Sequence, residues 1–193
     1  MVTYGDAYKL KLGEPAPTFS NLPAVDGKKY SLESFKDKKV LVVVWYCNHC
    51  PYAQAYRERF NDVAKDYGPK GVGFVAINSN DPVEYPADDF PHMVEHVQQH
   101  KLVFHYLFDE TQQVAEAYGA VCTPHVLGFD QQRLLRYQGR FDGDQQNPQG
   151  GRARELRAAL DQMLTGQPVK EAVTRAFGCS IKWNKEHFLK IKR

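Results

Sequence analysis

The chain alternates short apolar runs with segments whose apolar residues recur at helical spacing. Residues 40–45 are six consecutive apolar side chains, mostly β-branched, which predicts a strand buried on both faces. Apolar positions at steps of three and four then predict a helix, which Gly68 and Pro69 end. That helical stripe is Ala53, Tyr56, Phe60, Val63, Ala64 and Tyr67. A second buried strand is predicted over residues 72–77.

The same alternation continues through the second half of the chain. Asp88 or Asp89 is predicted to cap a helix that has Pro91 in its first turn. The inner face of that helix is Phe90, Met93, Val94 and Val97. Residues 138–151, rich in Gly, Gln and Asp, predict a long surface loop. The remaining predicted elements are strands over 104–108, 125–129 and 134–137, and helices over 111–118, 156–164 and 169–177.

The N-terminal part predicts a hairpin over residues 15–35, with its turn at Asp26-Gly27. Together these elements predict an α/β fold. Strands that alternate with helices imply right-handed crossovers, and a late hairpin adds antiparallel strands. We therefore expect a mixed central sheet with helices on both faces, an N-terminal β-hairpin and a C-terminal helical extension.

Composition fits one globular domain of 193 residues, because 42% of the residues are hydrophobic and 25% are charged. We expect residues 12–166 to form the core, and residues 167–193 a C-terminal extension with a basic, solvated tail. The net charge of +2 argues against nucleic acid or membrane partners. No apolar run reaches a membrane-spanning length, and no signal peptide is evident. Four cysteines are too few for a disulfide scaffold, so we expect reduced thiols and a cytoplasmic protein. We also expect a monomer or weak homodimer.

The residues that suggest chemistry are Cys47 and Cys50, which stand where the first buried strand meets the first helix. A helix N-terminus offers unpaired N–H groups and partial positive charge, which favours a thiolate at Cys47. Cys50 can then close onto Cys47 and release a mixed disulfide. Pro51 suits the first helical turn, and a charged His49 would stabilise the thiolate further.

Other interpretations of the cysteines and histidines stay open. A CxxC pair also forms half of a zinc site, although the chain has no second CxxC. Cys122 is a possible additional redox thiol, or a small buried hydrophobe, and Cys179 is a resolving thiol or a packing residue. His92, His96 and His100 recur every four residues, which fits a metal stripe or the exposed or half-exposed face of a helix.

Thr123-Pro124 stands before a predicted strand and carries either a cis or a trans peptide bond. In the cis form, the bend would bring the Thr123 backbone towards the cysteines.

The ordered set of motifs resembles the thioredoxin superfamily, in its AhpC/TSA and TlpA-like branch, and within it a group called peroxiredoxin-like. The motifs are residues 12–19, Asp26-Gly27, the CxxC after the valine-rich strand, residues 76–81, 117–124 and 178–183. The resemblance implies a thioredoxin-like fold and a cis Pro124. It also implies that Thr123 and Pro124 pair with a substrate backbone by strand addition. Asn48, His49 and Pro51 would support the cysteine pair, and Trp45, Tyr46 and Tyr52 would line an apolar contact surface.

Three features, at four positions, depart from the related families. The hydroxyl and proline of the peroxiredoxin motif are replaced by Val44 and Val40, counting back from Cys47. Leu41 stands where thioredoxins carry a buried aspartate, and His125 stands where an acidic residue is expected, which would alter substrate contacts.

We therefore expect a thiol-disulfide oxidoreductase with Cys47 as nucleophile and Cys50 as resolving thiol, and with no cofactor and no metal. Its partners would be a disulfide-bearing protein or small thiol substrate and an upstream thiol reductant. The alternatives are a peroxiredoxin-like thiol peroxidase with antioxidant activity, and a copper-binding protein of the same fold.

Overall fold

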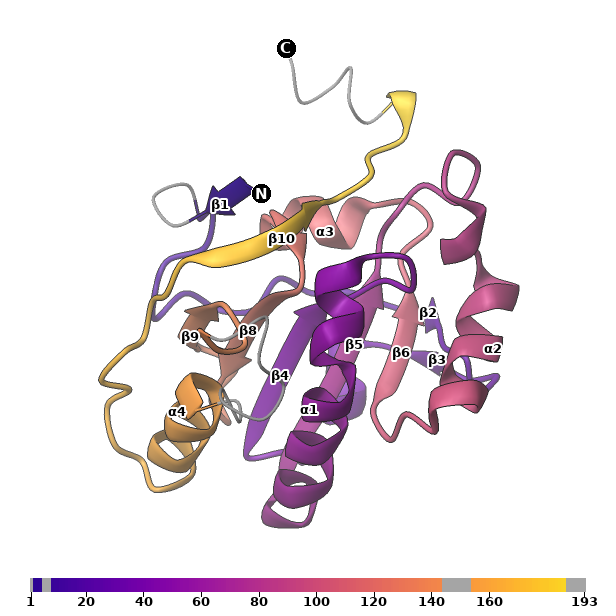
Figure 1. Ribbon diagram of the computed structural model, residues 1–193. Helices are drawn as coiled ribbons and strands as arrows, with labels where there is room; N and C mark the ends of the chain where they lie inside the picture. The colour runs from indigo at the N-terminus through magenta and orange to yellow at the C-terminus, as the bar shows by residue number, and fades with distance from the viewer. Residues whose placement is uncertain (1, 5–7, 144–153, 187–193) are drawn as a thin grey trace.

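A five-stranded central sheet organises the molecule (Figure 1). The computed structural model describes residues 2–4, 8–143 and 154–186. The strand order is β6-β5-β4-β8-β9, with β4 parallel to β5 and antiparallel to β8. The bounds are β4 Val40–Trp45, β5 Val72–Asn78, β6 His105–Phe108, β8 His125–Phe129 and β9 Leu135–Gly139. The prediction of a mixed central sheet is therefore confirmed.

Helices cover both faces of this sheet, as the sequence predicts (Figure 1). One face carries α1, α2 and α4, and α3 packs on the other with the segment that precedes β4. The α-helix bounds are α1 Pro51–Tyr67, α2 Phe90–His100, α3 Gln113–Tyr118 and α4 Arg154–Leu164. Short 3-10 turns are η1 Leu32–Phe35, η2 Gly68–Lys70 and η3 Pro86–Asp88.

Strand β4 divides the hydrophobic core into two layers. Its side chains alternate between the sheet faces, so that Val42 packs towards α1 and Val43 towards the opposite layer. All six residues of β4 are buried, as expected of a central strand covered on both sides. The predicted inner stripe of α1 is buried in full. These contacts fix the position of α1, and hence of the residues between β4 and α1.

The prediction of a helix over residues 169–177 is wrong, because the chain there makes a turn at residues 170–171 and an isolated bridge at Val173 before it enters β10 (Ala176–Ser180). β10 lies between β1 (Val2–Tyr4) and β7 (Cys122–Thr123) in a second sheet, antiparallel to both. Pairing on both edges provides the backbone hydrogen bonds that a helix would have provided. The four-residue spacing of Val169, Val173 and Phe177 is therefore not a helical face: Val173 is exposed, whereas Phe177 is buried.

The predicted surface loop over residues 138–151 is buried in its first part. β9 runs to Gly139, and Phe141 and Asp142 are fully buried. The Phe141 ring packs on Phe60 with centroids 4.1 Å apart, and Asp142 pairs with buried Arg59. Phe141 and Asp142 therefore each contact a side chain of α1, and this part of the predicted loop belongs to the core. Residues 144–153 lie outside the described residues.

The N-terminal hairpin is confirmed but very short, with β2 Leu22–Pro23 paired to β3 Lys29–Tyr30. Its turn lies at the predicted Asp26-Gly27, where Gly27 takes a φ of +80° that favours glycine.

Helix α2 begins as predicted, because the Asp89 carboxylate accepts the His92 backbone N–H. The expected exposed face of its three histidines is wrong for His96. That side chain is buried, and its Nε2 lies 2.9 Å from the Tyr46 hydroxyl. Burial lowers the pKa of His96 to about 4, so the ring that hydrogen-bonds the Tyr46 hydroxyl is neutral.

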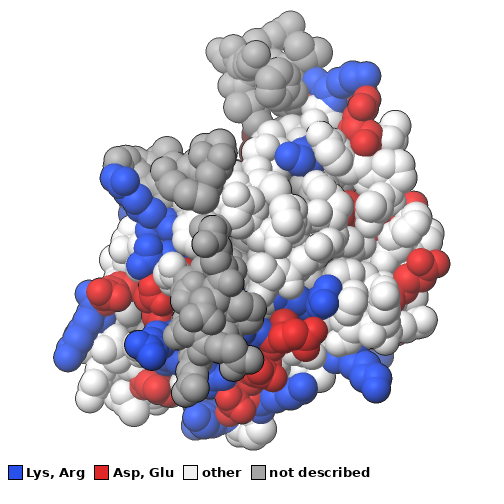
Figure 2. All heavy atoms as spheres, viewed as in Figure 1, with Lys and Arg blue, Asp and Glu red and all other residues white. Residues whose placement is uncertain are grey.

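Positive and negative side chains are interspersed over the face shown in Figure 2, and the area above the start of α1 is largely uncharged. Of the basic tail, Lys185 pairs with Glu84 at 3.1 Å, and residues 187–193 lie outside the described residues. Within the described ranges, no helix combines the length and apolarity that crossing a bilayer requires.

Candidate active site

The two cysteines lie where the sequence places them, between the end of β4 and the start of α1. Cys50 is the N-cap residue of α1, and Pro51 is its first helical residue. Both cysteine side chains have no exposed surface, and both are free thiols. The strand anchors Cys47 and the helix anchors Cys50, so their separation is set by the junction between two rigid elements.

Thr123 lies against both sulfurs. The Thr123-Pro124 peptide bond is cis, as the resemblance implies. The Sγ atom of Cys47 is 3.5 Å from Thr123 Oγ1, and the Cys50 thiol donates to the Thr123 carbonyl oxygen at 3.0 Å. The expected approach of the Thr123 backbone to the cysteines is therefore confirmed.

The thiol with the lowered pKa is Cys50, and not Cys47 as the sequence predicts. A hydrogen bond from Cys47 lowers the pKa of Cys50 to about 5, with further donation from Thr123 and from the N–H groups of Ala53 and Cys179. These donors outweigh burial, which raises it. Burial raises the pKa of the Cys47 thiol, and the Cys50 contact and the Asp88 charge raise it further. The helix N-terminus thus acts on Cys50, its own cap residue.

His49 is paired with Asp88, a residue for which the sequence predicts only a possible role as a helix cap. The His49 Nδ1 atom makes a very short contact with Asp88 Oδ2 and lies 3.9 Å from Cys47 Sγ. This hydrogen bond raises the pKa of His49, and the same pairing lowers the pKa of Asp88 against the opposing effect of burial. The pairing favours the charged forms of both His49 and Asp88, and the carboxylate offsets the effect that the sequence predicts His49 to have on Cys47.

Asp88 is the centre of a wider network that holds the CxxC loop. Its Oδ1 accepts the backbone N–H groups of Asn48 at 2.8 Å and His49 at 3.2 Å. Its Oδ2 accepts the amide of Asn80 at 2.7 Å, and its backbone oxygen accepts Asn78 at 2.7 Å. The Asn80 Oδ1 atom in turn accepts the Lys182 backbone N–H at 2.9 Å, which joins the C-terminal segment to the site. Asn78 and Asn80 lie in the 76–81 motif, and that motif is the one sequence feature that pointed to this network.

Asn48 and Pro51 lie beside the cysteines, Asn48 in two side-chain hydrogen bonds and Pro51 at the first position of α1. The Asn48 amide donates to the Ala87 carbonyl at 2.9 Å, and its side-chain oxygen accepts the Tyr106 hydroxyl at 3.1 Å. The buried Leu41 provides no carboxylate at the position where thioredoxins carry one. Asp88 reaches Cys47 from a different element instead.

The expected apolar contact surface is wrong for two of its three residues. Trp45, the last residue of β4, and Tyr46, which follows it, have no exposed surface, because their side chains enter opposite core layers. The Trp45 indole N–H donates to Ser79 at 3.3 Å. Tyr52 is only partly buried, and its ring meets Phe177 edge-on at 6.4 Å.

Cys122 and His125 lie in closed apolar surroundings. Cys122 is fully buried beside Tyr8 and Ala176, and burial raises the pKa of its thiol well above the usual range. This environment opposes a role as an additional redox thiol. His125 is also buried and stacks on Tyr8 with ring centroids 5.0 Å apart. Its side chain therefore has almost no exposed surface with which to contact a substrate, contrary to the expectation from the sequence. Burial lowers the pKa of His125 to about 3.

Strand addition of a substrate at Thr123 meets an obstacle that the sequence did not reveal. β10 already pairs with β7, with Cys179 opposite Thr123 and Ser180 opposite Cys122. In Figure 1, β10 crosses above the end of β4 and the start of α1. An external strand therefore cannot occupy this edge unless β10 leaves it.

Among the residues that the structure describes, Cys47, His49 and Asp88 form a group that could hold a metal ion, because their ligand atoms all lie within 4.8 Å of one another. However, both Asp88 carboxylate oxygens already accept hydrogen bonds from the protein. In this structure, His49 and Asp88 thus form an ion pair with each other.

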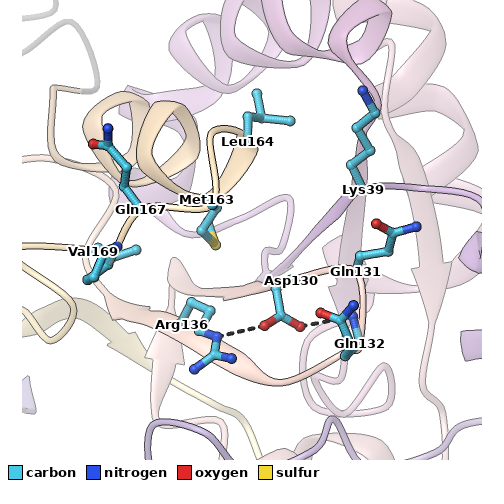
Figure 3. A pocket seen from close by; sticks show the side chains of 11 residues that line it. Lys39, Asp130, Gln131, Gln132, Arg136, Met163, Leu164, Gln167 and Val169 are labelled. Carbon is cyan, nitrogen blue, oxygen red and sulfur yellow. Dashed lines mark hydrogen bonds and ion pairs between the residues drawn. The ribbon is translucent and has the colours of Figure 1, made fainter.

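A cavity of about 570 Å³ lies elsewhere, at the opposite end of β4 from the cysteines (Figure 3). Lys39, which precedes β4, lines it together with Met163 from α4. An ion pair between Asp130 and Arg136, at 2.6 Å, closes one side. None of its lining residues is a thiol.

Comparison with known proteins identifies the fold and the family. The Redoxin family model matches residues 11–151. An uncharacterised conserved protein from Geobacillus kaustophilus is 40% identical, with a TM-score of 0.89 over 96% of this chain and 98% of its own. A hypothetical protein from Sinorhizobium meliloti 1021 is 36% identical, with a TM-score of 0.86 over 94% of this chain and 100% of its own.

A more distant structure links the fold to thioredoxins. A thiol:disulfide interchange protein of the thioredoxin family from Chlorobium tepidum is 20% identical, with a TM-score of 0.60 over 81% of this chain and 99% of its own. At this identity the likeness shows the fold alone, and it confirms the predicted thioredoxin-like architecture. No curated protein matches the sequence.

The two thiols should titrate far apart. In the reduced protein, we expect a thiolate to form near pH 5, because Cys50 has a pKa of about 5. Cys47→Ala removes the largest cause, so the midpoint should rise towards the ordinary value of ~8.5. Ultraviolet thiolate absorbance against pH measures both, with Cys122→Ala as a control that leaves the step in place. A low-pH step that survives Cys50→Ala would contradict the assignment.

Asp88→Asn should lower the pKa of His49, because the Asp88 hydrogen bond is the largest cause that raises it. The raised pKa of His49 contributes stability below ~6.5, which is lost as pH rises through the folded value. The lowered pKa of Asp88 contributes stability above ~3.9, which is lost as pH falls through the folded value. The stability gap between the two proteins should therefore be larger at pH ~5.5 than at pH ~8.5.

His49 ring resonances in NMR and urea unfolding at the two pH values test this expectation. Asp89→Asn is the matched control, since Asn also caps helices and Asp89 contacts the exposed His92. An unchanged His49 titration in Asp88→Asn would refute the ion pair.

Proposed function

Because the chain belongs to the Redoxin family, we propose that it is a thiol-disulfide oxidoreductase in which Cys47 and Cys50 cycle between dithiol and disulfide. The observation that carries the proposal is the contact between two buried thiols at a helix N-terminus, beside the Thr123 backbone. The two sulfurs lie close enough to share a hydrogen bond, and Cys50 has the lowered pKa that such chemistry needs.

In the proposed reaction, Cys47 attacks a substrate disulfide and Cys50 resolves the product. The Cys47 proton passes to the Cys50 sulfur along their hydrogen bond as Cys47 bonds to the substrate sulfur. The second substrate sulfur leaves as a thiolate and takes that proton. The Cys50 thiolate then attacks Cys47, forming the Cys47–Cys50 bond and releasing the first substrate sulfur. The low pKa of Cys50 suits this second step, because the resolving sulfur is a thiolate near neutral pH.

The proposed substrate is a disulfide-bearing protein or a small thiol compound, and the pair is returned to its reduced form by an upstream thiol reductant. Under this proposal the protein works in the cytoplasm, where disulfides are transient. Substrate approach is proposed on the His49 side, because His49 is next to Cys47 and its side chain is 25% exposed. The exposed Tyr85 ring stacks on His49 at 5.2 Å and extends that surface.

Two other functions compete with this proposal. A thiol peroxidase would need the hydroxyl and proline that Val44 and Val40 replace, and both valines are buried in β4. Metal binding is favoured by the close approach of Cys47, His49 and Asp88. Metal analysis of the reduced protein would reverse the ranking if it found one bound ion per chain.

Replacement of either cysteine by serine should abolish insulin disulfide reduction, with a loss on the order of 100-fold or more, because each step needs its own sulfur. Cys50→Ser should also accumulate a mixed disulfide on Cys47, which mass spectrometry of the tryptic peptide 40–57 detects. Cys122→Ser is the matched control and should retain full activity.

Three outcomes are informative. Unchanged insulin reduction in Cys47→Ser would refute the proposal. Rapid, saturable oxidation by hydrogen peroxide with no disulfide reduction would favour the peroxidase instead. A mixed disulfide that accumulates on Cys50 in Cys47→Ser, with none on Cys47 in Cys50→Ser, would exchange the proposed roles of the two sulfurs.

A further inference from the structure

β10 occupies the position in which a substrate strand would pair with the site. It runs antiparallel to β7, with Cys179 directly opposite Thr123. Gly178 makes the approach possible, because a Cβ atom there would lie 2.1 Å from the Thr123 carbonyl oxygen. The C-terminal segment thus presents a cysteine to the active site in the manner of a bound peptide.

The register places Cys179 on the same face as the active-site sulfurs. Directly opposed residues of an antiparallel pair have side chains on one face of the sheet, with Cβ atoms about 4.5–5.5 Å apart. Thr123 points its hydroxyl at Cys47 on this face. Cys179 accordingly contacts Cys50 in two ways: its thiol lies within hydrogen-bonding reach of the Cys50 sulfur, and its backbone N–H donates to that sulfur.

Cys179 is also the accessible member of the three cysteines. Cys47 and Cys50 have no exposed surface, whereas Cys179 is only partly buried. Its position is held by the residues that follow it. Ile181 is buried, and the Lys182 carbonyl oxygen accepts Asp81 N–H and the Gln112 amide, both at 2.8 Å. These contacts hold β10 in place beside Cys50.

We propose that Cys179 is a third redox thiol. It attacks the buried Cys47–Cys50 disulfide and is then itself reduced by an external dithiol, so that electrons pass from the reductant to the buried pair through Cys179. This inference rests on the proposed function and deepens it. Cys47 faces the substrate, Cys50 stands in the middle, and Cys179 faces the reductant.

The exchange balances without a cofactor. The Cys179 thiol loses its proton to solvent and attacks Cys50 of the Cys47–Cys50 disulfide. The Cys50–Cys179 bond forms, and Cys47 leaves as a thiolate that takes up a proton. One sulfur of an external dithiol then attacks Cys179, and Cys50 leaves as a thiolate. The second sulfur of the reductant closes onto the first and releases Cys179. The Cys47 and Cys179 thiolates take up protons from solvent, and Cys50 remains a thiolate. Two electrons pass from the dithiol to the protein, and the two protons of the dithiol go to solvent.

Burial raises the pKa of Cys179 to about 11, and the adjacent Cys50 thiolate adds to this effect. In the oxidised pair Cys50 carries no charge, so that contribution disappears. Reduction should therefore accelerate as pH rises, because the attacking form of Cys179 is the thiolate.

The first experiment tests whether the Cys50–Cys179 bond forms. Full-length Cys47→Ser is oxidised with diamide and digested with trypsin, which releases Cys50 in peptide 40–57 and Cys179 in peptide 176–182. We expect these two peptides to be linked by a disulfide. Cys122 lies in a separate peptide, 102–133, and should remain free. Recovery of peptides 40–57 and 176–182 without a link would overturn the proposal.

The second experiment measures the rate at which dithiothreitol reduces the Cys47–Cys50 disulfide. Cys179→Ser should slow this reduction by about tenfold or more, because the remaining sulfurs are buried. Cys122→Ser is the control and should keep the native rate. In Cys179→Ser/Ser180→Cys, the thiol moves to the other face of β10, so this variant should stay slow. An unchanged rate in Cys179→Ser, or recovery in the double variant, would overturn the relay.

The two proposals fail differently. If Cys47 and Cys50 never form a disulfide in the native protein, the proposed function fails. If that disulfide forms but Cys179→Ser leaves its reduction rate unchanged, only the relay fails.

Discussion

The chemistry of the two thiols depends on one constraint, which is that both are removed from water at the junction of β4 and α1. Burial disfavours a thiolate, so a buried sulfur becomes charged only where donors replace the lost water. Cys50 caps α1 and receives N–H groups from Ala53 and from Cys179 on β10. Cys47 has no such set and faces Asp88. The same environment thus gives the two sulfurs opposite pKa shifts, which is how neighbouring groups come to have different roles.

The Asp88 network explains why this junction keeps its shape. One carboxylate accepts the backbone of the CxxC loop and the His49 ring, and through Asn80 it reaches the C-terminal segment. The loop, the end of β5 and the residues after β10 are therefore held by one buried polar cluster. A buried polar cluster destabilises the fold if some of its groups lack hydrogen-bond partners, and it is rigid when all of them are hydrogen-bonded. It links the position of Cys179 to that of Cys47, although the two lie far apart in the sequence.

Much of the fold was predictable because its local patterns agree with the tertiary structure. The apolar run of β4, the stripe of α1 and the turn at Gly27 each lie as the sequence indicates. The position of the CxxC followed from them. Errors arose where distant segments decide the outcome. Residues 176–180 form a strand because β1 and β7 pair with them, and Phe141 and Asp142 are buried because α1 supplies Phe60 and Arg59. Local spacing carries no signal for such partners. The Asp88 pairing and the reversed cysteine pKa values were missed for the same reason.

The reduction potential of the Cys47–Cys50 pair, measured by equilibration with reduced and oxidised glutathione, tests the central claim most directly. Stabilisation of the Cys50 thiolate favours the reduced form and makes the disulfide more oxidising. We expect one two-electron transition, with a potential between the thioredoxin value of about −270 mV and the DsbA value of about −120 mV. Two thiols that stay free across this range, or that each form a separate adduct with glutathione, would contradict it.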